Sequence, residues 1–268
     1  MKIKKVNLVY FSATNTTKKV LHAIAEGIDS AKPQEYDITL GQIEKVEFAK
    51  DELVIFGVPV FSGRIPELTI AALNKFTGDD TPAIVVCLYG NRDYDDALLE
   101  LRNTIAANNY TILSAGAFIG QHSIFPQTAS NRPDPLDLDI ANKFGEQSLA
   151  YLAKYSSSQE VDLNIPEVIV KGDFPYRKTK PIPLKPSTNR SCILCGKCAR
   201  NCPTQAIPLD NPRKTDSSLC ISCGRCIFIC PENSRNFRGL TYQVVSKKFN
   251  RDNIVRKEPE LFFPSLVD

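Results

Sequence analysis

Residues 6–28, VNLVYFSATNTTKKVLHAIAEGI, place a short apolar run, a hydroxyl-rich turn and an amphipathic segment one after another. The run at 6–11 combines β-branched and aromatic residues and predicts a buried strand. Four apolar residues then recur at helical spacing and predict a helix over 16–28: Val20, Leu21, Ile24 and Ile28. A strand that passes through a turn directly into a helix is the first unit of an α/β fold.

The same alternation continues to about residue 155. Further strands are predicted at 35–40, 52–60, 82–90 and 111–120, with helices at 66–76, 93–109 and about 135–155. Because 52–60 and 82–90 are continuous apolar runs, we expect a parallel sheet that is covered on both faces. Five strands at these spacings fit a doubly wound parallel sheet with the strand order 2-1-3-4-5.

Beyond residue 155 the periodicity decays, and residues 172–188 are rich in Pro, Lys and Thr, as in a semi-extended connector. We therefore divide the chain into an α/β domain, a connector, a cysteine-rich domain and a C-terminal tail, at 1–155, 156–186, 187–240 and 241–268. The net charge is −3 over residues 1–185 and +6 over residues 186–268. Metal clusters held by thiolates bring negative charge that such a basic segment offsets. Nucleic acid is not an expected partner, because the aromatic interleaving of RNA-binding segments is absent.

The cysteines fall into two runs with one spacing, C-x2-C-x2-C-x3-C-P, at 192–203 and 220–231. Disulfides are disfavoured because the chain shows no export signal, and the usual zinc patterns differ from this spacing. The repeated run is typical of bacterial ferredoxins, where two 4Fe–4S clusters each take the fourth ligand from the other run. This predicts one cluster on Cys192, Cys195, Cys198 and Cys230. It predicts a second cluster on Cys220, Cys223, Cys226 and Cys202.

A ninth cysteine, Cys87, lies inside the apolar run 82–90 and is predicted to be a small buried hydrophobe.

Three loops follow the first, third and fourth strands, at 11–19, 57–66 and 88–101. In doubly wound sheets, ligands bind at this carboxyl edge. The first loop is crowded with hydroxyls at the start of a helix, which favours a phosphate.

Residues 1–155 resemble the flavodoxin family, whose phosphate loop is S/T-x-T-G-N-T. Here residues 12–17 are Ser-Ala-Thr-Asn-Thr-Thr, with Asn15 in place of the usual Gly. Asn tolerates the left-handed conformation, so we expect the loop to keep its shape. The resemblance implies FMN, with its phosphate at Ser12, Thr14, Asn15, Thr16 and Thr17. It also implies two loops beside the isoalloxazine ring, with Phe61 and either Tyr94 or Tyr89 as stacking aromatics. Their candidate residues are Pro59, Val60, Phe61, Ser62, Gly63, Tyr89, Gly90, Asn91, Arg92 and Tyr94.

Residues 187–235 resemble two-cluster ferredoxins, and the whole chain resembles flavodoxin–ferredoxin fusion proteins. This implies an electron-transfer protein that passes electrons between two 4Fe–4S clusters and FMN, with redox proteins as partners and no catalytic side chain. Two alternatives stay open: an FMN-dependent reductase of a small organic acceptor, and a flavin-free ferredoxin with a flavodoxin-like docking domain. The connector allows flavin and cluster to meet within one chain or across a homodimer.

Neither a secretory signal nor an apolar run of about 20 residues is present, so we expect a cytoplasmic protein without a membrane partner. His122 follows the fifth strand and is a further candidate for flavin contact.

Overall fold

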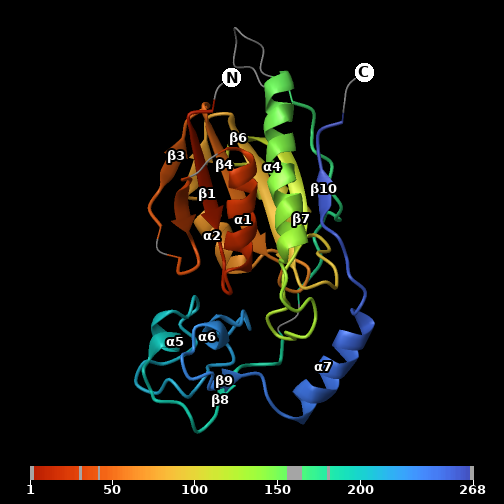
Figure 1. The fold of residues 1–268 in the computed structure, drawn as a ribbon. Helices are drawn as coiled ribbons and strands as arrows, with labels where there is room; N and C mark the ends of the chain where they lie inside the picture. Colours follow the sequence, from red (N-terminus) through yellow and green to blue (C-terminus); the bar gives the residue numbers. More distant parts are fainter. Residues whose placement is uncertain (1–2, 30–31, 42, 156–164, 180–181, 266–268) are drawn as a thin grey trace.

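The α/β domain is built around one main β-sheet with helices on both faces (Figure 1). The computed structural model describes residues 3–29, 32–41, 43–155, 165–179 and 182–265. Six strands form the sheet, in the order β10-β7-β6-β4-β1-β2. They are β1 (Lys5–Tyr10), β2 (Gln34–Asp37), β4 (Glu52–Pro59), β6 (Thr81–Tyr89), β7 (Tyr110–Ile119) and β10 (Glu260–Phe262). The first five are parallel and have the predicted order 2-1-3-4-5, so the predicted fold is confirmed.

Two helix layers cover the sheet. Helices α1 (Thr16–Gly27) and α4 (Pro135–Tyr155) pack on one face, and α2 (Glu67–Leu73) and α3 (Ala97–Ala106) pack on the other. A small parallel pair, β3 (Val46–Phe48) with β5 (Phe76–Gly78), flanks the second layer. Strand β4 shows why both faces must be covered, because its residues alternate between two apolar layers. Leu53 and Ile55 face the first layer, and Val54 and Phe56 face the second.

The C-terminal segment belongs to the sheet. Residues 241–268 are predicted to be a tail, but their described part holds most of α7 (Leu240–Asp252) and all of β10. Strand β10 pairs antiparallel with β7, with Leu261 opposite Gly116. It covers an edge that would otherwise expose unpaired backbone groups. The chain therefore leaves the α/β domain and returns to it (Figure 1).

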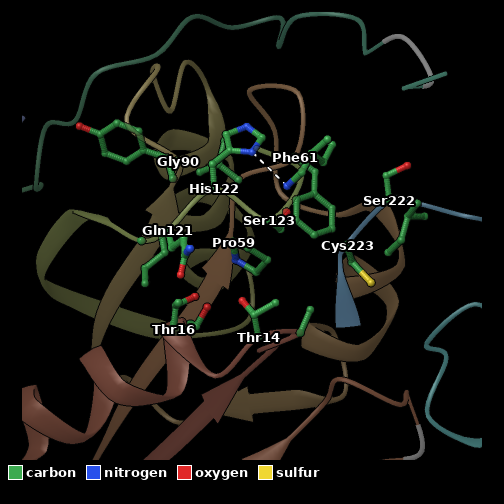
Figure 2. A pocket seen from close by; sticks show the side chains of 18 of the residues that line it. Thr14, Thr16, Pro59, Phe61, Gly90, Gln121, His122, Ser123, Ser222 and Cys223 are labelled. Carbon is green, nitrogen blue, oxygen red and sulfur yellow. Dashed lines mark hydrogen bonds between the residues drawn. The ribbon is translucent and has the colours of Figure 1, made fainter. Parts of the chain in front are cut away.

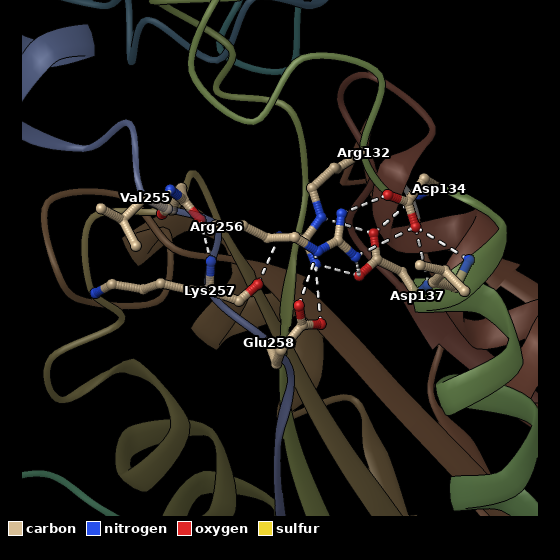
Figure 3. Close-up of polar contacts among 9 residues, drawn as sticks. Arg132, Asp134, Asp137, Val255, Arg256, Lys257 and Glu258 are labelled. Atoms are coloured by element: carbon tan, nitrogen blue, oxygen red, sulfur yellow. Dashed lines mark hydrogen bonds and ion pairs between the residues drawn. The ribbon is translucent and has the colours of Figure 1, made fainter.

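An ion-pair network, buried at Arg132 and Asp137 and partly exposed at Arg256, fastens this returning segment (Figure 3). Arg132 is 6% exposed; its Nε donates to Asp137 over 2.8 Å, and its Nη1 donates to the Lys257 carbonyl over 2.6 Å. Arg256 lies 2.6 Å from the Asp134 carboxylate, and this hydrogen bond lowers the pKa of Asp134 to about 2. The start of α4 is thus tied to the segment before β10.

In the sequence, the cysteine-rich region comes between the α/β domain and the returning segment. In the structure, it lies under the carboxyl ends of the parallel strands (Figure 1). Its elements are short: β8 (Ser187–Thr188), α5 (Lys197–Arg200), α6 (Arg225–Phe228) and β9 (Arg235–Asn236). The described part of the preceding connector packs on α3, where the Asp96 carboxylate accepts from the backbone N–H groups of Asp173 and Arg177. Of the connector predicted at 156–186, residues 156–164 and 180–181 lie outside the described residues.

Candidate functional site

The loop between β1 and α1 presents hydroxyls and free backbone N–H groups. Asn15 has φ 62° and ψ 3°, the left-handed conformation expected for this position. Below it, buried Ser12 accepts a hydrogen bond from Lys18 N (3.2 Å) and donates its own N–H to Thr39 Oγ1 (2.9 Å). In the described part of the chain, the N–H groups of residues 14–17 have no acceptor. Together with the helix dipole, they fit a phosphate.

A cavity opens above this loop. Figure 2 shows Thr14 and Thr16 on one wall, Pro59 and Phe61 on another, and Cys223 on a third. Of the predicted flavin residues, these line it: Thr14, Thr16, Thr17, Pro59, Val60, Phe61, Ser62, Tyr89 and Gly90. None of the lining residues is acidic. Hydroxyls at one end and apolar walls elsewhere fit the phosphate and the ring of FMN.

Phe61 is held by a tight turn. Ser62 and Gly63 both have positive φ, and Phe61 and Arg64 exchange backbone hydrogen bonds of 2.9 and 3.2 Å. The Phe61 ring packs edge-on against Phe11, with 6.3 Å between centroids. The turn and the contact with Phe11 therefore hold Phe61 in the cavity wall.

Other predicted residues lie elsewhere. Gly63 and Arg92 border an adjoining compartment, and Asn15 borders a groove between α1 and α4. Tyr94 is 1% exposed and donates its hydroxyl to Glu260, so it does not face the cavity. The Asn91 amide donates to the carbonyls of Asn253 and Val255 and so holds the returning segment. Neither placement supports a flavin contact.

His122 forms part of the cavity wall directly above Gly90 (Figure 2). A Cβ on Gly90 would lie 2.4 Å from the His122 ring, so only glycine allows this packing. Nδ1 of His122 accepts from the N–H groups of Ile124 and Phe125, both at 3.1 Å. Burial, and then the charge of Arg92, lowers the pKa of His122 to about 4. The imidazole is therefore neutral, with its proton on Nε2.

Three wall residues come from the cysteine-rich region: Ile221, Ser222 and Cys223. The sequence predicted Cys223 as a cluster ligand, but it predicted none of the three as part of the flavin cavity. Ile182 from the connector joins them. Gly224 packs against Ser123, where a Cβ would meet the Ser123 side chain at 3.1 Å. No local pattern could have found these residues, because the contact joins segments about a hundred residues apart.

The cysteines predicted for one cluster surround a second, small cavity, which we name the cluster I site. Its cysteines are Cys192, Cys195, Cys198 and Cys230. Among the described residues, no three of His, Cys, Asp and Glu converge as they would around one ion. A cavity with thiols at its walls is what a cubane requires, because each iron takes one thiolate. The Ser234 hydroxyl lies 3.2 Å from Cys230 Sγ. Although burial opposes it, this contact and the backbone N–H groups beside it lower the pKa of Cys230.

The remaining four cysteines form the cluster II site: Cys202, Cys220, Cys223 and Cys226. Burial, and after it the negative charges of the other three thiolates, raise the pKa of Cys223 to about 12. Four thiolates this close would repel one another, so cations must hold them ionised. Iron supplies that charge in a 4Fe–4S cluster. Cys87, by contrast, lies fully buried within the sheet, as predicted.

Comparisons with known proteins match the cysteine-rich region to a family and the α/β region to solved structures. Residues 191–234 match the 4Fe-4S dicluster domain family. Similar solved structures include a flavodoxin from the domain Archaea, with 16% identity, 56% of this chain and 99% of that chain covered, and a TM-score of 0.37. A WrbA-like flavodoxin from Agrobacterium tumefaciens shares 15% identity, with 56% and 98% covered and a TM-score of 0.41.

Rubredoxin:oxygen oxidoreductase from Desulfovibrio gigas shares 14% identity, with 58% of this chain covered and a TM-score of 0.40. The alignment spans only 38% of that protein. Among curated proteins, no match was found.

By its strand order and its dicluster match, the chain joins a flavodoxin-like α/β domain to an iron–sulfur domain of the two-cluster ferredoxin type. No helix in the described ranges has the length and apolarity needed to cross a bilayer.

Proposed function

We propose that this chain transfers electrons between a partner redox protein and FMN, through the cluster I and cluster II sites in that order. The observation that carries the proposal is the position of Cys223, which belongs to the cluster II site and also lines the candidate flavin cavity. A cluster there would have one thiolate ligand in the wall of the flavin site. The contact lies within one chain, so no second copy is needed to form it.

The two cluster sites differ in exposure, which orders the path. Cys195 of the cluster I site is exposed, and Ile193 and Leu194 beside it are 62% and 54% exposed. Cys223 of the cluster II site is buried against the flavodoxin-like domain. A partner protein therefore reaches the cluster I site from solvent, while the cluster II site faces the flavin cavity.

The protein's own residues hold and shield the redox groups. The hydroxyls and N–H groups of residues 14–17 would bind the phosphate, and Phe61 would pack against the ring. Ile182 and Ile221 exclude water from the wall between the two domains. The bound cofactors supply the chemistry: each cluster carries one electron at a time, and FMN accepts one or two.

Two cysteine variants test the path in reconstituted full-length protein. Cys220→Ser removes a ligand of the cluster II site, and Cys195→Ser is the matched change at the cluster I site. With a one-electron donor protein as reductant, stopped-flow FMN reduction should slow at least about tenfold in both variants, because electrons pass through both cluster sites. A small-molecule reductant that reduces the cluster II site directly should bypass the cluster I site, so that FMN reduction stays intact in Cys195→Ser and slows at least about tenfold in Cys220→Ser. Equal rates in the two variants with the small-molecule reductant, each with FMN bound and its remaining cluster present, would exclude the proposed order.

A second candidate function is reduction of an organic acceptor. It is favoured by a compartment of about 880 Å³ that shares Gly90 and His122 with the flavin cavity and has apolar walls, including Phe125 and Phe249. Steady turnover with one of a panel of quinone and enone acceptors would support a reductase. A plain electron carrier would reduce them only slowly and without saturation.

The flavin-free alternative rested on the altered phosphate loop. Its motivation is weakened, because Asn15 adopts the left-handed conformation that the usual glycine would provide. FMN, iron and sulfide are to be measured in protein expressed with ample riboflavin. About one FMN per chain supports the proposal, and FMN-free protein with both clusters supports the flavin-free alternative.

A further inference from the structure

Arg235, at the start of β9, is a fully buried cation without an acidic partner. Its side chain is 1% exposed. Nη1 donates to the Pro212 carbonyl (2.6 Å), and Nη2 donates to the Pro186 carbonyl (3.4 Å) and to the Thr215 hydroxyl. Within the described residues, no carboxylate pairs with the guanidinium, and Nε has no acceptor. A buried charge that lacks a counter-charge is costly, so its partner must lie elsewhere.

The sulfur atoms around Arg235 identify that partner. Nη1 lies 3.9 Å from Cys198 Sγ, in the cluster I site. The charge of Arg235 also acts on Cys226, in the cluster II site, where it opposes the rise that burial causes in the pKa of that thiol. One guanidinium thus contacts a ligand position of the cluster I site and lies within electrostatic reach of one in the cluster II site. A cubane with four thiolates is anionic and becomes more so on reduction, so two such clusters supply the missing negative charge.

We propose that Arg235 is an electrostatic positioning residue that raises the reduction potentials of both clusters and lessens the repulsion between electrons held on both at once. Each cluster then takes one electron from a one-electron donor protein, and the chain stores two. That number matches the flavin couple, in which FMN, two electrons and two protons give FMNH2. The inference about Arg235 rests on the two clusters alone and stands whether or not FMN is the acceptor.

The rival explanation is purely structural, because the bonds to Pro212, Pro186 and Thr215 also hold three chain segments together. Two substitutions separate charge from shape. Arg235→Gln removes the charge, whereas Arg235→Lys keeps it and loses the planar fork. Arg200→Gln is the matched control: Arg200 also lies beside the cluster I site, donating to the Cys195 carbonyl over 2.7 Å, but it is exposed and screened by solvent.

The experiment is an anaerobic redox titration of reconstituted, FMN-free full-length protein, followed by electron paramagnetic resonance. In Arg235→Gln, the reduced-to-oxidised ratio of both clusters at fixed potential should fall at least tenfold, which is about 59 mV for a one-electron couple. The midpoint potential at which the spin-coupled signal of the doubly reduced form appears should shift further than the midpoint potential of the signal of the singly reduced form. Arg235→Lys and Arg200→Gln should stay within about twofold of the unmodified protein.

Two results would overturn the proposal: ratios within about twofold of the unmodified protein in a cluster-loaded Arg235→Gln variant, or an equal shift in Arg235→Lys and Arg235→Gln. If Arg235→Gln takes up no clusters, Arg235→Lys decides alone. Unchanged potentials there support the role of charge, and a tenfold shift excludes it. A failure of electron transfer to FMN would leave this titration unaffected, so the two proposals fail separately.

Discussion

Phe56 in β4 and Ile207 in the iron–sulfur region are both buried, but their surroundings differ. Phe56 belongs to an apolar layer that extends from β1 to β7, with a matching layer on the other face of the sheet. Around Ile207, only a few apolar side chains are buried, and neither α5 nor α6 has a buried residue. Instead, Ile193, Leu209, Leu219 and Phe228 remain exposed there.

The difference shows that one chain uses two means of folding. The flavodoxin-like domain is stabilised by apolar burial, and the iron–sulfur region must be stabilised by its clusters. With the predicted exchange of cysteines between the runs, each cluster would tie residues 192–202 to residues 220–230 and so take the place of an apolar core. The returning segment is stabilised together with the flavodoxin-like domain, because β10 pairs with β7 and ion pairs hold the residues before β10.

Removal of iron should have the largest effect on this contrast. After chelation, hydrogen exchange should become fast throughout residues 187–236, while β1, β4 and β6 keep their protection, because only the first region depends on metal. Strand β10 is the internal control: it follows the iron–sulfur region in sequence but pairs in the sheet, and it should stay protected. Slow exchange across residues 187–236 in the iron-free protein would show that the region has a sufficient core of its own.

The reverse test is to create a cavity in the apolar core of the α/β domain and to leave the iron–sulfur region unchanged. Phe56 has no exposure, and its ring lies 5.1 Å from that of Tyr110. Phe56→Ala should lower the free energy of unfolding of the α/β domain by about 3–5 kcal/mol and leave the iron content unchanged. Urea unfolding followed by circular dichroism, with iron analysis, measures both. Leu136→Ala, at a residue 66% exposed, should change stability by less than about 0.5 kcal/mol. Iron loss in folded Phe56→Ala would contradict the independence of the two parts.

Sequence patterns were sufficient where the physical cause is local. The five parallel strands were predicted within a few residues; β4 and β6 have the continuous apolar runs that burial on both faces leaves, whereas β2 is partly exposed. The cysteine spacing predicted which thiols surround the cluster I site. In contrast, β10 has three residues between Pro259 and Pro264, too few for a strand signal. The wall formed by Ile221 and Cys223 depends on how two domains pack, which no local pattern carries.

The region where the two parts meet is sensitive to pH through His122. Its pKa of about 4 lies below the ordinary value of 6.5, so the unfolded chain binds the proton more readily between these values. The stabilisation from neutral His122 is complete above pH 6.5 and is lost as the pH falls toward 4. Between pH 7 and pH 5 the free energy of unfolding should fall by about 2 kcal/mol from this group. An imidazole NMR titration should give a midpoint near 4.

His122→Asn separates this effect from general acid destabilisation. The variant has no group that titrates in this range at the site, so its loss of stability between pH 7 and pH 5 should be about 2 kcal/mol smaller than that of the unmodified protein. Equal losses, or an NMR midpoint near 6.5, would show that the ring is more open to water than the structure indicates.

The smallest effect concerns the loop where the fold and the flavin site coincide. Asn15 has a left-handed backbone, which costs most residues about 1–2 kcal/mol and glycine almost nothing. Asn15→Ala should therefore weaken FMN binding by about fivefold, equivalent to about 1 kcal/mol, while Asn15→Gly should bind FMN at least as tightly as the unmodified protein. Fluorescence quenching of added FMN measures all three. Because Asn15 lies outside the cavity, its substitution acts through backbone shape alone, and equal affinities for the Ala and Gly variants would mean that FMN does not require this loop conformation.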